Sequence, residues 1–220
     1  MAQKYVYALA AGHFFNDIGM GILPAVLPFF MANYGMNYEE VAGLMFGACF
    51  LSSVVQPTFG WLADRMSKNW MMSLGICLSG VAMGAIGLFQ NYWLIFAVVT
   101  VSGIGSAIFH PEAARMVNKI SGKKRGTALS IFSMGGNAGF AFGPIIVVAL
   151  ITAFGMKGTL AFSVLALLMS IILLFIVPYI KREIATNKVN LQIQGKDIEM
   201  PDRKNDWGAF LRLTMLIICS

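Results

Sequence analysis

The residues of this chain that could do chemistry are ionisable side chains embedded in otherwise apolar sequence. His13 and Asp17 stand four residues apart in one long apolar segment, and His110 lies in another. Residues four apart share a helix face, so the first two side chains can interact. Charged groups inside a membrane-spanning segment are costly and are functional candidates by default. Proton uptake and release is the chemistry that these groups could supply. An inward-facing structural hydrogen bond is the alternative for His13 and Asp17.

Glu112 and Arg115 form a second candidate pair, three residues apart and so also on one helix face. Glu112 is a further candidate proton carrier, and Arg115 is either its ion-pair partner or a contact for an anion. A structural ion pair at the end of a helix is the alternative. Asn16 and Asn137 are uncharged polar residues in apolar surroundings, and Asn137 could face a cavity.

The composition indicates that lipid surrounds most of these residues. Of the 220 residues, 58% are hydrophobic and only 12% are charged, whereas soluble domains carry about 25% charge. This excludes a disordered chain, a secreted disulfide scaffold and almost every water-soluble enzyme. The three cysteines have no paired spacing, and the sequence contains no nucleotide-binding, metal-binding or nucleophile–base motif. We therefore expect no enzyme activity, no cofactor and no metal site.

Stretches without Asp, Glu, Lys or Arg are long enough to cross a bilayer. A spanning helix needs about 20 apolar residues. Such stretches occupy residues 18–38, 41–63, 69–111, 126–156 and 158–180, and the third is long enough for two spans. The expected fold is an all-α membrane protein with six helices, at residues 5–33, 40–63, 70–89, 92–117, 127–153 and 158–180.

The basic residues of the loops predict the orientation of the chain. Thirteen Lys and Arg residues fall on the side of the N-terminus, and only Lys157 falls on the other side. Short loops rich in Lys and Arg stay in the cytoplasm. The sequence therefore predicts a multi-pass protein of the cell membrane with a cytoplasmic N-terminus. The net charge of +6 reflects these loops and requires no nucleic-acid partner.

The sequence after residue 180 is of a different kind. Residues 181–206 are polar and mixed in charge, and we interpret them as a cytoplasmic linker that follows a six-helix domain at residues 1–180. Residues 207–220 are apolar again, but these 14 residues are too few to span. We interpret them as the truncated start of a seventh helix. An amphipathic tail on the membrane surface is the alternative.

A glycine, an aspartate and two basic residues lie in and beside the loop after the second predicted helix. The segment reads GWLADRMSKN, and the four residues are Gly60, Asp64, Arg65 and Lys68. It resembles the GxxxDRxGRK loop of the major facilitator superfamily, with Ser67 and Asn69 as departures. In that superfamily the loop helps to latch two halves closed toward the cytoplasm. Ordinary basic flanking residues with a chance aspartate are the alternative.

The fifth predicted helix carries small residues and a proline at a fixed spacing. Gly139, Gly143 and Pro144 resemble the GxxxGP core of a motif found in drug/proton antiporters of the same superfamily. Glycines four apart form a smooth stripe for tight packing, and the proline removes a backbone hydrogen bond. Val147 and Val148 stand where the motif usually has glycines. Generic helix packing is the alternative.

Three segments together narrow the resemblance. GHFFNDIGMGILPAVLPFF, GSAIFHPEAARMV and GGNAGFAFGP are similar to the fosmidomycin-resistance family, within a match that covers residues 5–180. The resemblance implies a proton-driven exporter of twelve helices built from two six-helix halves. This chain would supply the first half, the linker and the start of the second. Its partners would be the missing C-terminal half, protons, a small-molecule substrate and the lipid bilayer.

The function expected from the sequence is proton-coupled efflux of small molecules. Asp17 is the first choice as proton carrier and Glu112 the second, with His13 and His110 as relays or tuning groups. The first and fourth helices would line a path near the bilayer midplane. Two alternatives stay open. One is uptake of an organic anion or sugar by the same fold, and the other is a membrane fragment or gene remnant that does not transport.

Overall fold

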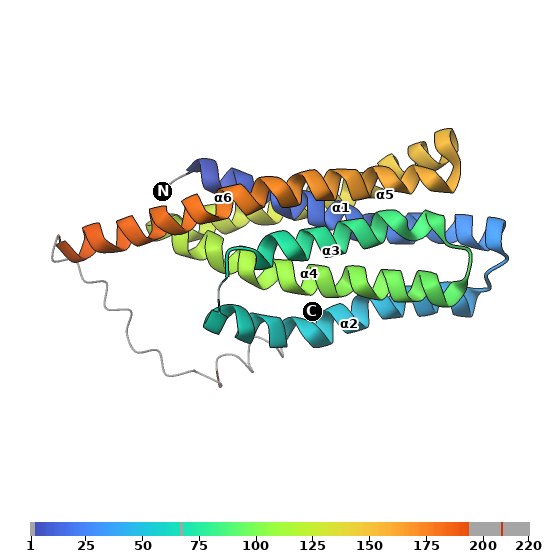
Figure 1. Ribbon diagram of the computed structural model, residues 1–220, viewed down its shortest axis with the longest axis horizontal. Helices are drawn as coiled ribbons and strands as arrows, with labels where there is room; N and C mark the ends of the chain where they lie inside the picture. The colour runs from blue at the N-terminus through green and yellow to red at the C-terminus, as the bar shows by residue number, and fades with distance from the viewer. Residues whose placement is uncertain (1–2, 67, 194–207, 209–220) are drawn as a thin grey trace. The chain divides into compact units, whose positions relative to one another are not determined.

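The computed structural model describes residues 3–66, 68–193 and 208 (Figure 1). Over these residues the predicted all-α fold with six helices is confirmed. The helices are α1 (Gln3–Tyr34), α2 (Tyr38–Met66), α3 (Met71–Ala85), α4 (Tyr92–Ser121), α5 (Arg125–Phe154) and α6 (Leu160–Ile193). Short 3₁₀ turns follow three of them, namely η1 (Ile86–Leu88), η2 (Gly122–Lys124) and η3 (Gly155–Thr159).

The last helix is longer than the sequence predicts. α6 passes Pro178 and continues to Ile193, so the first part of the expected linker is helical. The segment directly after residue 180 contains no glycine or proline, and its Lys, Arg, Glu and Ala residues favour a helix whether or not lipid surrounds it. The chain divides into two compact units, Met1–Glu183 and Ile184–Ser220. Apart from Gly208, the rest of the expected linker and the expected seventh helix lie outside the described residues.

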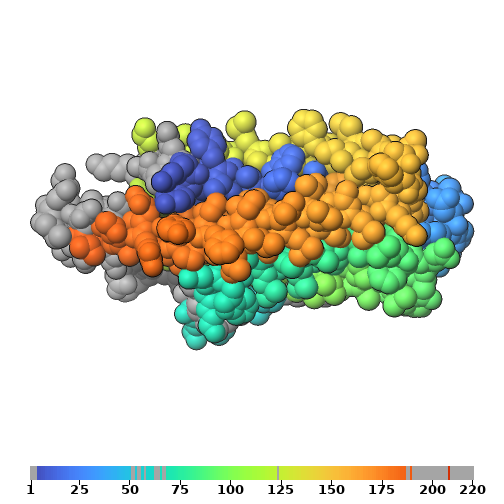
Figure 2. Space-filling view, turned by 45° about the horizontal axis from the view of Figure 1, so that its top comes forward, coloured from blue at the N-terminus to red at the C-terminus, as the bar shows by residue number. Residues whose placement is uncertain are grey.

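Within the first unit, the helices pack in a way that brings distant segments together. α1 packs along α5, and α4 packs against both α2 and α3 (Figure 1). α1 also contacts α3 and α4. α6 lies against α3, where Gly80 faces Ala166 and Gly84 faces Ser163, and Figure 2 shows it crossing one face between α1 and α3. The contact between α1 and α4 is the one that assembles the site described below.

The seam between α1 and α5 is built on glycine. A Cβ atom at Gly139 would collide with the carbonyl oxygen of Phe14, and one at Gly143 would lie 2.6 Å from the carbonyl oxygen of Ile18. From the other side, a Cβ at Gly21 would lie 2.5 Å from the carbonyl oxygen of Phe140. The two backbones therefore approach more closely than any other residue type would allow, as the glycine spacing predicts. α5 continues through Pro144 without ending.

Local signals in the sequence explain where two helices begin. At the start of α2, the Asn37 side chain accepts a hydrogen bond from the Glu40 N–H, and the Glu40 carboxylate accepts one from the Asn37 N–H, both at 2.9 Å. This reciprocal pair follows the logic of a capping box. At the start of α4, the Asn91 side chain accepts from the N–H groups of Trp93 and Leu94. These caps fix the turns that carry α2 and α4 back across the molecule.

Length and composition mark four segments of the described chain as able to cross a membrane. They are Lys4–Tyr34, Met71–Leu88, Tyr92–Ser121 and Arg125–Thr186. The last contains both α5 and most of α6. α2 is not among the four, so its spanning stays a prediction. Large apolar side chains are exposed along α5 and α6, including Phe142, Ile145, Leu168 and Phe175, which suits helices that face lipid.

Candidate functional site

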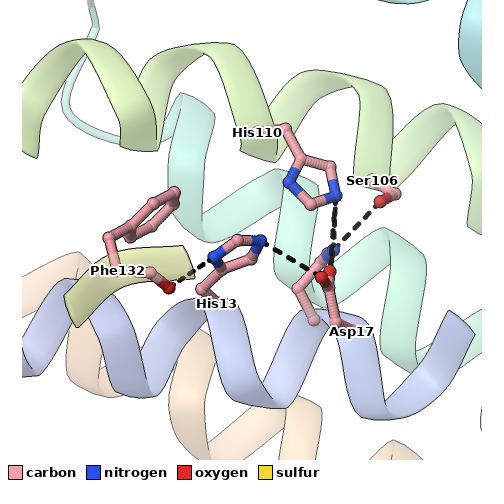
Figure 3. Close-up of polar contacts among 6 residues, drawn as sticks. His13, Asp17, Ser106, His110 and Phe132 are labelled. Carbon is pink, nitrogen blue, oxygen red and sulfur yellow. Dashed lines mark hydrogen bonds and ion pairs between the residues drawn. The ribbon is translucent and has the colours of Figure 1, made fainter. Parts of the chain in front are cut away.

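Three ionisable side chains from two helices meet inside the six-helix unit (Figure 3). His13 and Asp17 come from α1, and His110 comes from α4. The His13 Nε2 atom lies 3.1 Å from Asp17 Oδ2, and the His110 Nε2 atom lies 3.3 Å from Asp17 Oδ1. The predicted interaction between His13 and Asp17 is confirmed. The structure adds the second imidazole, and we call these three residues the His–Asp–His cluster.

A carbonyl group of α5 orients His13. The Nδ1 atom of His13 lies 2.8 Å from the carbonyl oxygen of Phe132, and the two rings stack with their centroids 4.1 Å apart. A carbonyl oxygen can only accept, so this contact places a proton on Nδ1. The Nε2 atom of His13 is therefore the nitrogen that faces Asp17.

A buried amide completes the network on the other side of Asp17. The Asn16 side chain is 1% exposed. Its Nδ2 group donates to Asp17 Oδ1 and to the hydroxyl oxygen of Ser106, both at 2.9 Å, which uses its two hydrogens. The His110 Nε2 atom lies 3.3 Å from the same nitrogen, which has no hydrogen left to donate to it. His110 Nε2 therefore carries a proton, and this proton points to Asp17 Oδ1. Asn16 thus ties α1 to α4 beside the cluster.

The contact between His13 and Asp17 requires one proton between the two groups. With Nδ1 protonated, a neutral His13 has only a lone pair on Nε2, and an ionised Asp17 has only lone pairs on Oδ2. Two such acceptors 3.1 Å apart do not attract each other. A proton on Nε2 or on the carboxyl group turns the contact into a hydrogen bond. The geometry of the cluster therefore creates a place for one positive charge.

The cluster is partly accessible in the described chain. The side chains of His13, Asp17 and His110 are 12%, 18% and 26% exposed, respectively. A fully enclosed group could not exchange a proton or an ion with a water-filled path. Partial exposure combined with a position inside the candidate spans Lys4–Tyr34 and Tyr92–Ser121 suits a group that can exchange a proton.

Gly136 of α5 makes the space that the cluster occupies. A Cβ atom at this position would lie 2.5 Å from His13 Nε2 and 2.7 Å from Asp17 Oδ2. The sequence predicted no role for Gly136, Phe132 or Ser106. Gly135 and Gly136 are adjacent in the sequence, but Gly135 packs against the backbone of Ala10. The sequence alone does not distinguish a glycine used for packing from one that faces a site.

The predicted pair of Glu112 and Arg115 is confirmed, but it lies apart from the His–Asp–His cluster. The Arg115 Nε and Nη2 atoms donate to Glu112 Oε2 at 3.0 and 2.8 Å, and Nη2 also donates to Oε1 at 2.9 Å. The Glu112 side chain is 1% exposed. Lys181 of α6 interacts electrostatically with both residues. The α4 side chains that reach Asp17 and Asn16 are Ser106 and His110.

The other predicted site residues are distributed over α2 and α5. Asn137 is exposed on α5, and Gly60 of α2 faces Pro111 of α4, with 3.8 Å between the position of a Cβ at Gly60 and the Pro111 Cβ.

Near the end of α2, the Arg65 guanidinium lies 4.1 Å from the centroid of the Trp61 ring. The Lys68 ammonium lies 6.0 Å from the centroid of the Trp70 ring. The Asp64 side chain lies outside the described residues, and α2 continues past Asp64 to Met66. Gly139, Gly143 and Pro144 lie in the seam with α1.

Comparison with known proteins shows the family. The model of the Major Facilitator Superfamily matches residues 9–219. The chain belongs to the major facilitator superfamily. The members of this superfamily are membrane transport proteins and not enzymes. Over 76% of its length it is 29% identical to the fosmidomycin resistance protein of Escherichia coli strain K12. Over the same share it is 30% identical to the uncharacterized MFS-type transporter YfnC of Bacillus subtilis strain 168.

More distant relatives also match this chain over part of their length. The chain is 25% identical over 70% of its length to the multidrug resistance protein MdtG of Yersinia enterocolitica. A crystal structure of tetrameric PepTSo2 superposes with a TM-score of 0.63 at 20% identity, over 83% of this chain and 41% of that one, which shows the fold. The chain spans about two fifths of the fosmidomycin resistance protein and of YfnC, 41% in each case. This share is consistent with half of a superfamily fold.

Proposed function

We propose that this chain is the first half of a proton-coupled secondary transporter that exports small molecules from the cell, with Asp17 as the proton carrier. The observation that carries the proposal is the His–Asp–His cluster, which holds Asp17 between two imidazoles of α1 and α4 at 3.1 and 3.3 Å. The names of two relatives refer to fosmidomycin resistance and multidrug resistance. Those names support efflux as the direction and drug-like molecules as the substrate class.

Proton binding at Asp17 would change how α1 holds α4. When Asp17 is ionised, its oxygens accept from His110 and Asn16, and they accept from His13 only when that ring carries protons on both nitrogens. When Asp17 takes up a proton, the negative charge that these donors face is lost. The attraction between α1 and α4 then weakens, because charge-assisted hydrogen bonds are stronger than neutral ones. This links the protonation state to the packing of the two helices that would line the transport path.

His13 and His110 have different parts in this proposal. His13 is anchored at Nδ1 by the Phe132 carbonyl oxygen, so its Nε2 is the nitrogen that exchanges a proton with Asp17. His110 is the more exposed of the two and contacts the other carboxylate oxygen. We therefore assign the exchange of protons with the cavity to His110 and the local transfer to His13.

Glu112 is the weaker candidate for proton coupling. Its carboxylate already accepts three hydrogen-bond contacts from Arg115 and also faces the charge of Lys181. The carboxylate is thus already engaged by Arg115 on its own helix and by Lys181 on α6. We assign the pair of Glu112 and Arg115 to the joining of α4 with α6, and we keep the role of proton carrier for Asp17.

The basic end of the unit is assigned to the cytoplasm. Arg65 lies over the Trp61 ring in the last turn of α2, and Lys68 lies near the Trp70 ring between α2 and α3, as side chains at a membrane surface do. With Gly60 against α4 and Asp64 in the same turn, this segment would form the cytoplasmic gate against the second half of the transporter. Asn137 is exposed on α5 and is assigned to the path between the halves.

Transport by a full-length protein that contains this chain tests the proposed function. Inside-out membrane vesicles with an imposed pH gradient, acid inside, should accumulate labelled fosmidomycin or another member of a drug panel. A protonophore that collapses the gradient should abolish the accumulation. Transport that survives the protonophore would contradict proton coupling. Gradient-driven movement of the same compounds out of these vesicles would contradict export.

A further inference from the structure

We propose that His13, Asp17 and His110 form a binding site for one divalent transition-metal ion of the Zn²⁺ class. One ligand atom from each residue lies within 4.8 Å of the other two. The site is supplied by two helices, so it exists only when α1 and α4 are packed together. The inference goes beyond the proposed function, because binding of the ion by this chain does not depend on transport.

The spacing of the ligand atoms suits a metal ion of this size. Zinc binds imidazole nitrogen and carboxylate oxygen at about 2.0–2.2 Å, so two ligands of a tetrahedral site lie about 3.3 Å apart. The two measured separations in the cluster are 3.1 Å from His13 Nε2 to Asp17 Oδ2 and 3.3 Å from His110 Nε2 to Asp17 Oδ1. These two separations involve different oxygens of Asp17, and one ligand atom from each of the three residues lies within 4.8 Å of the other two. Side-chain rotations that bring the three atoms to about 3.3 Å from one another would centre an ion.

The surroundings orient His13 as the second shell of a metal site does. A metal-binding histidine usually donates its other ring N–H to a carboxylate or a backbone carbonyl, which fixes the ring and the tautomer. His13 makes this contact through Nδ1 to the carbonyl oxygen of Phe132 at 2.8 Å. The lone pair of Nε2 consequently points into the cluster (Figure 3). His110 offers its Nε2 lone pair when its proton moves to Nδ1.

Asn16 can supply a further oxygen ligand. Its Nδ2 group now faces Asp17 and His110, and its Oδ1 atom is buried without a hydrogen-bond partner among the described residues. Rotation of the amide by half a turn exchanges these two atoms with little change of shape. The carbonyl oxygen would then face the cluster as a fourth ligand. The hydroxyl of Ser106 now accepts from Asn16, and after this rotation it can donate to the Asn16 oxygen instead.

The donor set selects the class of ion. Two imidazoles with one carboxylate suit Zn²⁺ and other late divalent transition metals, whereas Mg²⁺ and Ca²⁺ prefer sites made of oxygen alone. His13, Asp17 and His110 alone leave one position of a tetrahedral site open for water, and the Asn16 oxygen would fill that position after the amide rotates. The single carboxylate also supplies the negative charge that a cation inside a spanning segment requires.

Metal titration of the full 220-residue chain in detergent micelles tests the proposal. The chain contains only two histidines, so a preparation without a histidine tag has no competing imidazole. Added Co²⁺ should give the strong visible absorption of a four-coordinate ion at one equivalent, and Zn²⁺ should displace it. Mg²⁺ should not. Absence of that absorption, or displacement by Mg²⁺, would overturn the proposal.

Three substitutions locate the site. His13→Ala, Asp17→Asn and His110→Ala should each weaken Co²⁺ binding by more than about tenfold, since loss of a second-shell partner alone costs about 10–100-fold. Glu39→Gln is the matched control, because Glu39 is an exposed carboxylate at the start of α2 and should leave the affinity unchanged. Equal affinity in all four variants would place the metal elsewhere and refute the assignment.

A measurement on the unaltered chain guards against variants that fail to fold. Zn²⁺ should protect His13 and His110 from modification by diethyl pyrocarbonate, as read by mass spectrometry, and Mg²⁺ should not. Modification of both histidines at the same rate with and without Zn²⁺ would contradict the site. Neither experiment measures transport, so failure of metal binding leaves the proposed function standing, and failure of proton coupling leaves the metal site standing.

Discussion

Gly136 on α5 lies directly against Asp17 on α1, so closely that a Cβ atom at residue 136 would be 2.7 Å from Asp17 Oδ2. The same Cβ would lie 2.5 Å from His13 Nε2. A helix that contributes no ionisable group to the His–Asp–His cluster thus determines how much room the cluster has. Three helices, and not only the two that carry the ionisable residues, define the site.

Substitution Gly136→Ala should disturb the cluster with little effect on the fold. The atoms that the new methyl group would meet are the ends of two side chains, which can rotate away. We expect Co²⁺ affinity of the chain to fall by about tenfold or more, as for loss of a supporting group. The change in melting temperature should be small. Unchanged Co²⁺ affinity would show that the room next to Asp17 is not limiting.

Substitution Gly139→Ala should do the opposite. Here the new methyl group would collide with the carbonyl oxygen of Phe14 in the backbone of α1, which cannot rotate away. We expect a loss of stability of about 1–3 kcal/mol, as for other overpacked interiors, measured by thermal unfolding in detergent. Gly126→Ala is the control, because a Cβ atom at Gly126 meets nothing within 4 Å. Equal melting temperatures for the Gly126 and Gly139 variants would contradict the close approach of α1 and α5.

Substitution Glu112→Gln should destabilise the chain. The Glu112 side chain is 1% exposed and accepts from Arg115 at 2.8 to 3.0 Å. Removing one partner of a buried ion pair costs about 3–5 kcal/mol, because the remaining charge stays buried. Thermal unfolding should show this loss, and the exposed Glu39→Gln variant should not. If Glu112→Gln unfolds like the unaltered chain, the pair does not hold α4 and α6 together.

The local part of the site could be predicted from the sequence, and the long-range part could not. The interactions of His13 with Asp17 and of Glu112 with Arg115 follow from helical spacing, because both residues of each pair lie within one turn of the same helix. The contact of His110 with Asp17 joins residues from two helices. Charge patterns locate helices but do not determine which faces of two helices meet. For the same reason no local motif predicts the metal site that we propose at the cluster.

The fold was predictable for a different reason. Long stretches without charge fix the number and position of helices almost independently of tertiary contacts, so the starts and ends of α1 to α5 lie close to the predicted bounds. The predicted end of the sixth helix at residue 180 was wrong, because a polar segment can continue a helix as readily as it can begin a linker. The spacing of Gly139 and Gly143 indicated tight packing, but the sequence did not show that α1 is the partner.

Site-directed labelling tests the orientation. In a variant whose native cysteines are replaced, a cysteine at position 123 should react only with a reagent that enters the cell. One at position 39 should react with an impermeant reagent from outside. The reason is the excess of Lys and Arg on the side of the N-terminus. Labelling of position 123 by the impermeant reagent in intact cells would reverse the proposed topology.

The substitution Asp17→Asn in a full-length transporter that contains this chain tests the central claim most directly. Asparagine keeps the size of the side chain but cannot take up or release a proton. Proteoliposomes should then show no accumulation driven by an imposed pH gradient, while exchange of labelled for unlabelled substrate without a gradient continues at a similar rate. The exchange assay also shows that the variant is folded. Full gradient-driven accumulation by the Asp17→Asn protein would show that Asp17 is not the proton carrier.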